Sequence, residues 1–550
     1  MTHARRWAVP GYALVLTLAV TGPALRPGYL LLRDAVSTPR SYLTDTALGL
    51  GGTAPRAVPQ DFAVAALSAL IDGGVAVKSA LIAAVFAAAL GAARLAGQLV
   101  ADSGMAGQFI AATLAAWNPF VAERLLQGHW SLLLGYGCLP WVAAAAARTN
   151  WVGLVFWTAL AGITPTGLIL AAVVALVCAP RRTVIIAALA AAAASPWLSA
   201  SVLGGTLGSA QSSGLAPFAA RAEPGLGTLG SLAGLGGIWN AEAVPPSRTT
   251  LFALPATLVL LGVVALGIGV VLRRPTARGL LLLAVAGVVL PAAMATGPGL
   301  AVLRTMVDAA PGLAVLRDGQ KWAALAMPGY ALAGAGSVLT ARRFIRPTFW
   351  APVCCVALIA VLADLTWGAW GRMTPVVYPP QWAEVAAAVN AEPRTVAVLP
   401  ADSMRRFTWS GPAPVLDPLP RWVRAEVLST GDVTVAGRTV AGEGDHARAV
   451  QLLLISGADP ATLAAAGVGW VAVEGGTPGQ MGQAARTLAR LPIAYRDGEM
   501  TLYRAGGMTP RAAASRRIAV IAAHLLWAGM LIGSAAVLAV QSARRPWRRS

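Results

Sequence analysis

Residues 250–274 read TLFALPATLVLLGVVALGIGVVLRR, and this stretch decides the class of the protein. No charged residue interrupts it before Arg273. A helix of about 20 apolar residues crosses the roughly 30 Å hydrocarbon core of a bilayer. Similar runs recur along the 550-residue chain, which is 57% hydrophobic and only 12% charged. A soluble protein of this length needs far more charge to cover its surface, so the sequence predicts a membrane protein.

The arginines predict how the chain crosses the membrane. Pairs such as Arg181-Arg182, Arg273-Arg274 and Arg342-Arg343 lie between apolar runs, and one topology places almost all of these clusters in the cytoplasm. This topology puts both termini in the cytoplasm and predicts an inner (plasma) membrane protein with about 11 to 12 helices. The predicted helices are 9–25, 75–93, 104–117, 131–147, a hairpin of two short helices in 151–178, 183–203, 250–272, 279–296, 322–341, 350–370 and 517–540.

The net charge of +19 does not indicate a nucleic-acid partner. The basic residues gather in short clusters between apolar runs, as topology signals and contacts with anionic lipid headgroups do. No basic surface interleaved with aromatic residues and no DNA-binding motif is present. The four cysteines all fall in apolar segments without ligand spacing, which predicts small core residues.

The predicted topology divides the chain into three parts. Residues 1–370 form a multi-helix transmembrane domain, 371–515 a small extracytoplasmic α/β domain, and 516–550 a final helix with a basic cytoplasmic tail. In the α/β domain, 395–399 and 469–473 are expected to be buried strands, 480–491 a helix and 500–503 an edge strand. The outer loops of the transmembrane domain are 26–61, 118–130, 204–249 and 297–321.

Most ionisable residues near the membrane fall in these outer loops, which predicts one site at the outer face. A carboxylate there is able to act as a general base on a sugar hydroxyl. Arginine or lysine is able to hold the phosphate of a lipid-linked leaving group. No metal-ligand cluster is recognisable, although outer carboxylates are able to share a divalent cation with a phosphate. The candidates are Asp34 as the catalytic residue and Glu123, Arg124, His129, Arg221, Arg317, Asp318, Gln320 and Lys321 as substrate-binding residues.

Each candidate also has a structural interpretation. Asp34 directly follows Arg33 and fits a solvated loop charge, while Glu123 and His129 fit polar residues at a helix end. Lys321 is one of only two lysines in the chain and fits a snorkelling residue before a helix. Three charges and a glutamine within 317–321 at a helix start also fit anion binding.

Several short stretches, taken in order, carry a resemblance to a known family. They are Gly28-Tyr29 through Asp34 in the first outer loop, Trp117-Asn118-Pro119-Phe120 with Glu123-Arg124 and Gly128-His129, the broken helices around Thr164-Pro165, Leu316 to Trp322, and Tyr495 to Arg504 near the end of the α/β domain. In this layout the chain resembles the GT-C superfamily, membrane glycosyltransferases that use polyprenyl-phosphate-linked sugars.

The resemblance implies transfer of a sugar by an inverting route at the outer membrane face. The implied donor is a polyprenyl-phosphate-linked sugar, and the implied acceptor is a cell-envelope glycan or lipid. The catalytic acid of the superfamily usually lies in the first outer loop, which points to Asp34, with Asp45 as the second choice. The Ala-, Gly- and Arg-rich composition is typical of a bacterium with a GC-rich genome. An elaborate envelope glycan in such a bacterium is the acceptor that we expect.

Two other functions stay open on the sequence. A transporter or flippase for a lipid-linked envelope precursor would also use broken helices, and it predicts charges near the bilayer midplane and internal repeats. Asp364 is the best candidate for such a charge, and the sequence shows no repeat. A non-catalytic envelope assembly protein would tolerate the loss of Asp34 and of the 317–321 cluster.

Overall fold

The structure, a computed structural model, describes residues 3–51, 55, 57–204, 214–435, 437–508 and 511–544. Parts of the predicted outer loops 26–61 and 204–249, and the end of the basic tail, lie outside the described residues.

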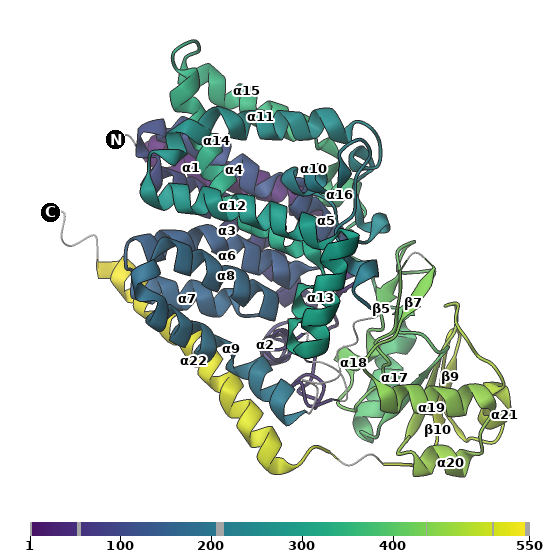
Figure 1. The fold of residues 1–550 in the computed structure, drawn as a ribbon. Helices are drawn as coiled ribbons and strands as arrows, with labels where there is room; N and C mark the ends of the chain where they lie inside the picture. The colour runs from purple at the N-terminus through teal and green to yellow at the C-terminus, as the bar shows by residue number, and fades with distance from the viewer. Residues whose placement is uncertain are drawn as a thin grey trace.

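Helices make up most of the chain before residue 370 and return at its end (Figure 1). Their bounds are α1 His3–Thr21, α2 Gln60–Leu67, α3 Gly73–Leu99, α4 Gly104–Ala116, α5 Pro119–Gln127, α6 Trp130–Ala147, α7 Trp151–Ala161, α8 Pro165–Cys178, α9 Thr183–Leu203, α10 Gly227–Ala233, α11 Ala253–Leu272, α12 Pro275–Met294, α13 Gly297–Ala309, α14 Ala326–Ala341, α15 Pro347–Ala360, α16 Thr366–Trp370 and α22 Ala514–Arg544. The protein is therefore a polytopic α-helical membrane protein, as the sequence predicts.

Within the described ranges, 8 helices are long and apolar enough to cross a membrane, and a bent pair at α15 and 363–370 would make a ninth. The other predicted spans are helical but short, namely α4, α7 and α8. The 71° bend after α15 also divides the predicted helix 350–370. Every predicted segment therefore contains a helix, but several of these helices are too short to be counted as membrane spans, which is why the count is lower than the predicted 11 to 12.

Helix-breaking residues explain why these helices are short. Asn118 accepts a hydrogen bond from the backbone N–H of Val121 at 3.1 Å and begins α5, so α4 ends at Ala116. Thr164 does the same for Gly167 at 3.1 Å and begins α8. In each case proline occupies the first helical position, where it lacks only an N–H that would have no helical partner.

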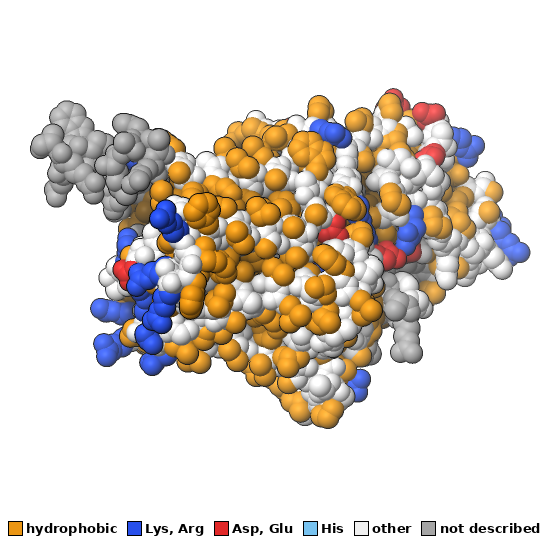
Figure 2. All heavy atoms as spheres, turned by 90° about the horizontal axis from the view of Figure 1, so that it is seen from above, with side chains coloured by type: hydrophobic (Ala, Val, Ile, Leu, Met, Phe, Trp, Pro, Cys, Tyr) orange, Lys and Arg blue, Asp and Glu red, His pale blue; other side chains and the backbone are white. Residues whose placement is uncertain are grey.

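The helices pack closely because small residues line their contacts. At Gly267 in α11, a Cβ atom would overlap the carbonyl group of Ala333 in α14. Close backbone approach of this kind is how helices associate within a membrane, where lipid is as apolar as the side chains. Figure 2 shows the outer surface of the helical part covered by hydrophobic side chains, with many Lys and Arg side chains gathered at one end.

A small α/β region follows the bundle. Its sheet has the order β3-β8-β10-β9, with β3 (Val396–Leu399) parallel to β8 (Trp470–Glu474) and the other pairs antiparallel. The prediction of an edge strand at 500–503 is wrong, because β10 (Met500–Arg504) lies between β8 and β9 (Ile493–Asp497). The tight turn at Gly498 folds β9 back onto β10, so β9 takes the edge.

Shorter elements complete this region, and one of them differs from the prediction. The helix expected at 480–491 covers only α21, Ala484–Leu488. The remaining elements are α17 Pro380–Ala391, β4 Met404–Arg405, β5 Val415–Leu416, α18 Leu419–Trp422, β6 Val433–Val435, β7 Arg438–Val440, α19 Asp445–Ser456 and α20 Pro460–Ala465.

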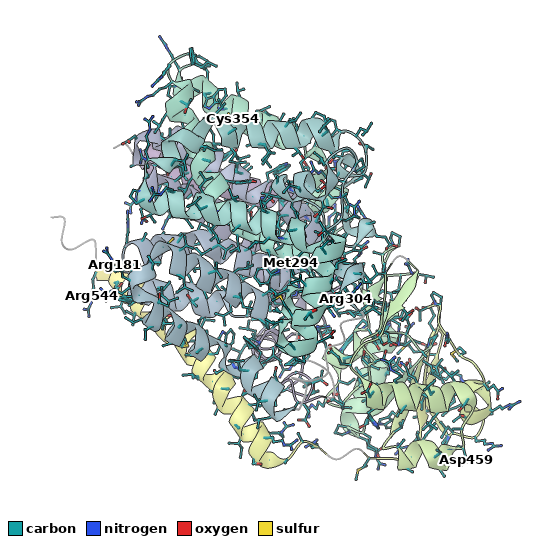
Figure 3. The ribbon with its side chains drawn as sticks, viewed as in Figure 1. Arg181, Met294, Arg304, Cys354, Asp459 and Arg544 are labelled. Atoms are coloured by element: carbon teal, nitrogen blue, oxygen red, sulfur yellow. The ribbon has the colours of Figure 1, made fainter. Side chains whose placement is uncertain are left out.

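The first loop of the bundle joins the two parts of the molecule. Its two short strands, β1 (Leu31–Leu32) and β2 (Ala35–Val36), form a tight hairpin. The hairpin turn pairs with β5, because Arg33 N–H donates to Pro414 O at 2.9 Å and Leu416 N–H donates to Arg33 O at 3.0 Å. In Figure 3, Arg181 and Arg544 lie at the end of the bundle away from Asp459 of the α/β region.

Candidate functional site

Asp34 lies in the turn of the β1–β2 hairpin and faces the turn between α5 and α6. Its Oδ2 accepts hydrogen bonds from Gln127 Nε2 at 3.0 Å and from His129 Nε2 at 2.8 Å. Its side chain is 36% exposed, and Oδ1 makes no hydrogen bond to any described residue. The structure therefore fixes one oxygen of this carboxylate and leaves the other open to a ligand.

The contacts of His129 determine its protonation. Arg124 Nη1 lies 3.0 Å from His129 Nδ1, and an arginine N–H can only donate, so Nδ1 must accept. The imidazole is then neutral and carries its proton on Nε2, from which it donates to Asp34. The pKa of His129 agrees with this state, since burial lowers it and the neighbouring Arg124 and Lys321 lower it further, against the attraction of Asp34.

Asp34 is ionised at neutral pH in this environment. Burial acts to raise its pKa, but the hydrogen bonds from His129 and Gln127 and the positive charge of Lys321 outweigh burial and hold the pKa below its ordinary value. Arg33, the preceding residue, has a positive φ of 51° and donates to Leu126 O at 2.7 Å. This buried contact holds the turn, and with it Asp34, against the end of α5.

A buried ion pair links this carboxylate site to Asp318, which directly precedes the 3₁₀ helix Gly319–Leu325 that leads into α14. Arg124 donates from Nη1 and Nη2 to the two oxygens of Asp318, each at 2.8 Å, in the bidentate geometry of strong pairs. Lys321 Nζ lies 3.7 Å from Asp318 Oδ2, and its side chain is 25% exposed. Burial raises the pKa of Asp318, but Arg124 and Lys321 outweigh burial and hold it well below its usual range. Nη1 and Nη2 of the buried Arg124 are engaged by Asp318 and His129, and its Nε has no hydrogen-bond partner among the described residues, whereas the Lys321 side chain is partly exposed.

Glu123 and Gln320 meet in a different, fully buried cluster. Glu123 accepts from the backbone N–H groups of Gly237 and Ile238 at 3.2 and 3.0 Å, and Gln320 Nε2 donates to it at 3.1 Å. Burial and the nearby carboxylate of Glu223 raise the pKa of Glu123. Both candidates therefore contact the glycine-rich outer loop 204–249 (the Gly-rich loop), and neither side chain is exposed to a ligand.

Arg221 belongs to this loop, and Arg317 contacts it from the segment before α14. The Arg317 guanidinium stacks over the Phe218 ring, 4.4 Å from its centroid. Arg221 Nε lies 3.4 Å from Ile238 O, and its buried Nη2 has no hydrogen-bond partner among the described residues. Among the nine candidates, the structure connects Asp34, His129, Arg124, Asp318 and Lys321 in one network and joins Glu123 and Gln320 in a second, while Arg221 and Arg317 contact residues of the Gly-rich loop.

Several residues outside the predicted set complete the site. Gln127 contacts Asp34 directly, and its Oε1 accepts from Asn240 Nδ2 at 2.8 Å. Glu223 pairs with Arg248, whose Nε donates at 3.1 Å, inside the Gly-rich loop. The sequence offers only one signal for these residues, which is their position in outer loops rich in polar residues.

Two residues weighed at the sequence level have other partners. The carboxylate of Asp45 pairs with Arg517 at the start of α22 and accepts from the N–H of Ala512 at 2.8 Å. Asp364 accepts from the N–H and the hydroxyl of Ser247 at 2.7 and 2.8 Å. The described part of the chain contains no group of three or more His, Cys, Asp or Glu placed to hold a metal ion, so we assign no metal ligand.

The described helices and the small sheet define a multi-pass membrane protein. The solved structure of the mycobacterial arabinofuranosyltransferase AftD matches 92% of this chain with a TM-score of 0.56 and 17% sequence identity. A mutant of AftD matches 92% of the chain with a TM-score of 0.57 and 17% identity. The GT-C resemblance is thus confirmed at the level of the fold.

The match covers only part of AftD. This chain spans 40% and 42% of the two AftD chains, or about two fifths of their length. No protein-family model matches the chain, and no curated protein matches it.

Proposed function

We propose that this protein is a membrane glycosyltransferase that moves a sugar from a polyprenyl-phosphate donor to a cell-envelope glycan or lipid acceptor. Asp34 is the general base and works at the outer face of the inner membrane. The donor and acceptor classes follow from the GT-C resemblance. AftD, the solved structure of similar fold, is an arabinofuranosyltransferase, which makes an arabinofuranosyl group the first sugar to test.

One observation carries this proposal. The Asp34 carboxylate is ionised and partly exposed, and it is oriented through one oxygen by neutral side chains while its second oxygen is open. A general base needs this combination, because it must be unprotonated at working pH and within hydrogen-bond reach of the proton it removes.

The proposed step is a single displacement. The acceptor hydroxyl transfers its proton to Asp34 Oδ1 while its oxygen forms a bond to the anomeric carbon of the donor sugar. The bond between this carbon and the phosphate oxygen breaks, and the electron pair leaves with the polyprenyl phosphate. Attack from the face opposite the phosphate inverts the configuration of the sugar.

Lys321 supports the leaving group in this proposal. Its side chain is partly exposed, and its charge acts on the pKa values of both Asp34 and Asp318. A positive charge at the phosphate stabilises the negative charge that develops there during the displacement. Nη1 and Nη2 of Arg124 already contact Asp318 and His129. We therefore assign Arg124 to orienting the site rather than to binding phosphate.

The orientation follows the positive-inside rule. By this rule we assign the end of the bundle with Arg181 and Arg544 to the cytoplasm. The α/β region with Asp459, which lies away from that end in Figure 3, is then outside the cell. Asp34 then lies on the outer side, because its hairpin pairs with β5 of the α/β region.

The test is the Asp34→Asn variant. The full chain in lipid nanodiscs is assayed for transfer from polyprenyl-phosphate-linked sugars, with the arabinofuranosyl donor first. We expect transfer to fall by about 10² to 10⁴, the range of general base catalysis. The thermal unfolding temperature should stay near that of the parent, because asparagine preserves the shape of the side chain.

Asp308→Asn is the matched control, since Asp308 is exposed on α13 and should keep full activity. Full transfer by Asp34→Asn would exclude Asp34 as the base. Absence of transfer by the parent with every donor would instead favour transport or assembly.

A further inference from the structure

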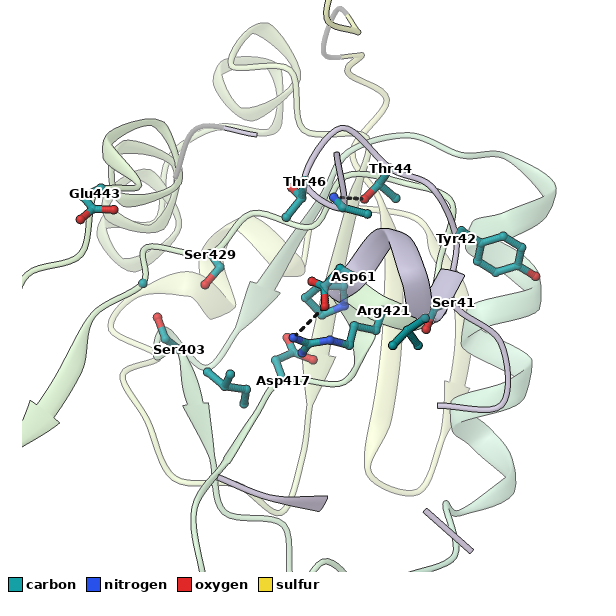
Figure 4. Close-up of a pocket in the computed structure, with 15 residues that line it drawn as sticks. Ser41, Tyr42, Thr44, Thr46, Asp61, Ser403, Asp417, Arg421, Ser429 and Glu443 are labelled. Atoms are coloured by element: carbon teal, nitrogen blue, oxygen red, sulfur yellow. Dashed lines mark hydrogen bonds and ion pairs between the residues drawn. The ribbon is translucent and has the colours of Figure 1, made fainter. Parts of the chain in front are cut away.

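A cavity of about 220 Å³ lies between the first loop of the bundle and the α/β region. The wall formed by the first loop and α2 carries Thr44, Thr46 and Asp61, and the wall formed by the α/β region carries Ser403, Asp417 and Ser429 (Figure 4). Since water occupies about 30 Å³ in the liquid, the volume holds several water molecules or one sugar ring with its hydroxyls. Asp34 does not line this cavity.

The cavity is nevertheless connected to the Asp34 hairpin. Leu416 of β5 lines the cavity, and its N–H donates to the carbonyl oxygen of Arg33 at 3.0 Å. Arg33 directly precedes Asp34. A ligand held against this strand therefore lies on an element that is hydrogen-bonded to the catalytic turn.

The charge of the lining disfavours an anionic ligand. The lining carries three carboxylates, from Asp61, Asp417 and Glu443, and one guanidinium, that of Arg421, while Asp417 also lies 3.8 Å from the buried guanidinium of Arg405. Arg421 Nη2 lies 3.5 Å from Asp61 Oδ1, so the one cation is partly neutralised. A phosphate or pyrophosphate would meet net negative charge here, whereas the positively charged Lys321 lies in the Asp34 network.

The remaining chemistry fits a neutral, hydroxyl-rich ligand. The lining offers serine and threonine hydroxyls that both donate and accept, together with carboxylates that accept from sugar hydroxyls. Asp61 Oδ2 makes no hydrogen bond to a described residue. Apolar groups, among them the side chains of Tyr42, Val64 and Leu416, form the rest of the lining and fit the apolar face of a sugar ring.

We propose that this cavity binds a sugar residue of a neutral glycan, beside the hairpin that carries Asp34. The inference rests on the proposed function, since an acceptor glycan anchored here would extend towards the catalytic carboxylate. It adds a binding site formed by the α/β region together with the first loop.

The test measures binding separately from transfer. The full chain in nanodiscs is titrated with neutral tetrasaccharides of pentose units and of hexose units, using saturation-transfer NMR and calorimetry. Ser429→Phe fills the cavity from an exposed position, and Asp61→Asn removes one carboxylate. We expect each variant to weaken binding at least tenfold, while Asp34→Asn binds like the parent.

Ser456→Phe is the matched control, because it adds the same ring at an exposed serine of α19 outside the cavity. Unfolding temperatures identify a variant that fails to fold. If one cavity variant does not fold, the binding affinity of the other cavity variant tests the proposal. Absence of binding by the parent, or unchanged binding by the folded cavity variants, would overturn the inference. Binding of inorganic phosphate in competition with the tetrasaccharide would overturn it in favour of an anion site.

The two proposals fail in different ways. If the parent transfers no sugar but binds the tetrasaccharide through the cavity, the glycan site stands and the transferase proposal falls. If transfer proceeds and neither cavity variant changes the KM for the acceptor, the glycan site falls and the transferase proposal stands.

Discussion

His129 acts on Asp34 through a hydrogen bond whose direction the structure determines. Because Arg124 must donate to Nδ1, the imidazole has only Nε2–H to offer, and this proton points at the carboxylate. The arrangement stabilises the ionised form of Asp34 without adding a positive charge that would bind the carboxylate as a salt bridge. His129 is thus a positioning residue for the proposed base.

His129→Ala should change the pH dependence of transfer. The hydrogen bond from His129 lowers the pKa of Asp34 against the effect of burial, so its removal should raise this pKa. The acidic limb of the kcat/KM profile should then move to higher pH, because the base must be ionised to work. Loss of a hydrogen bond to a charged group costs about 1.5–3 kcal/mol, or roughly 10- to 150-fold in kcat/KM near neutral pH.

The control for this prediction is His446→Ala, at an exposed histidine of α19, which should leave the profile unchanged. An unshifted acidic limb in a folded His129→Ala protein would contradict the proposed coupling.

At the scale of elements, the turn after α5 and the hairpin of β1 and β2 form the site by close packing. The turn after α5 carries Gly128 in a left-handed conformation with φ 81°, and it lies directly against the β1–β2 hairpin. A Cβ atom at Gly128 would collide with the backbone of Leu32 and Ala35, on either side of the Asp34 turn. Glycine here allows His129 and Asp34 to approach within 2.8 Å.

Gly128→Ala should therefore separate the hairpin from the turn and reduce transfer. A shift of 1 Å between reacting groups costs about 10²-fold, and we expect a loss of this order in kcat. Gly104→Ala separates this effect from backbone strain, because Gly104 also has a positive φ, of 58°, but nothing lies within 4 Å of its Cβ position. Equal activity of the two variants would show that close packing at Gly128 is unimportant.

At the scale of the whole molecule, the bundle has two chemically different ends. One end carries Arg181 and Arg544, and the α/β region with Asp459 lies away from it (Figure 3). The hairpin that carries Asp34 pairs with β5 of that region. This asymmetry is what the positive-inside rule requires of a protein that works at the outer face.

Cysteine labelling tests this orientation. A membrane-impermeant maleimide should react with Asp459→Cys in intact cells or spheroplasts, and with Arg181→Cys only after permeabilisation. Both positions are exposed, while Cys138, Cys354 and Cys355 are buried and Cys178 is partly buried, so the parent protein gives the background. The opposite labelling pattern would place the Asp34 site in the cytoplasm and exclude an outer-face transferase.

The sequence by itself predicts the class of the protein and the position of each membrane helix, although it misses α10 and α13 in the segments 204–249 and 297–321 expected to be loops. Both depend on local properties, namely the length of an apolar run and the residues that stop a helix, such as Asn118-Pro119 and Thr164-Pro165. It also predicts the buried strands 395–399 and 469–473, but not that β10 lies inside the sheet, because strand order depends on partners distant in the chain.

Only the tertiary structure decided which polar residues meet. Arg124 and Asp318 are 194 residues apart and Asp34 and Gln127 are 93 apart, so their contacts exist only once the bundle has packed. The same packing turns Glu123 towards the Gly-rich loop, while its neighbour Arg124 contacts His129 and Asp318. Adjacent helical residues point in different directions, and the surrounding helices determine what each one touches.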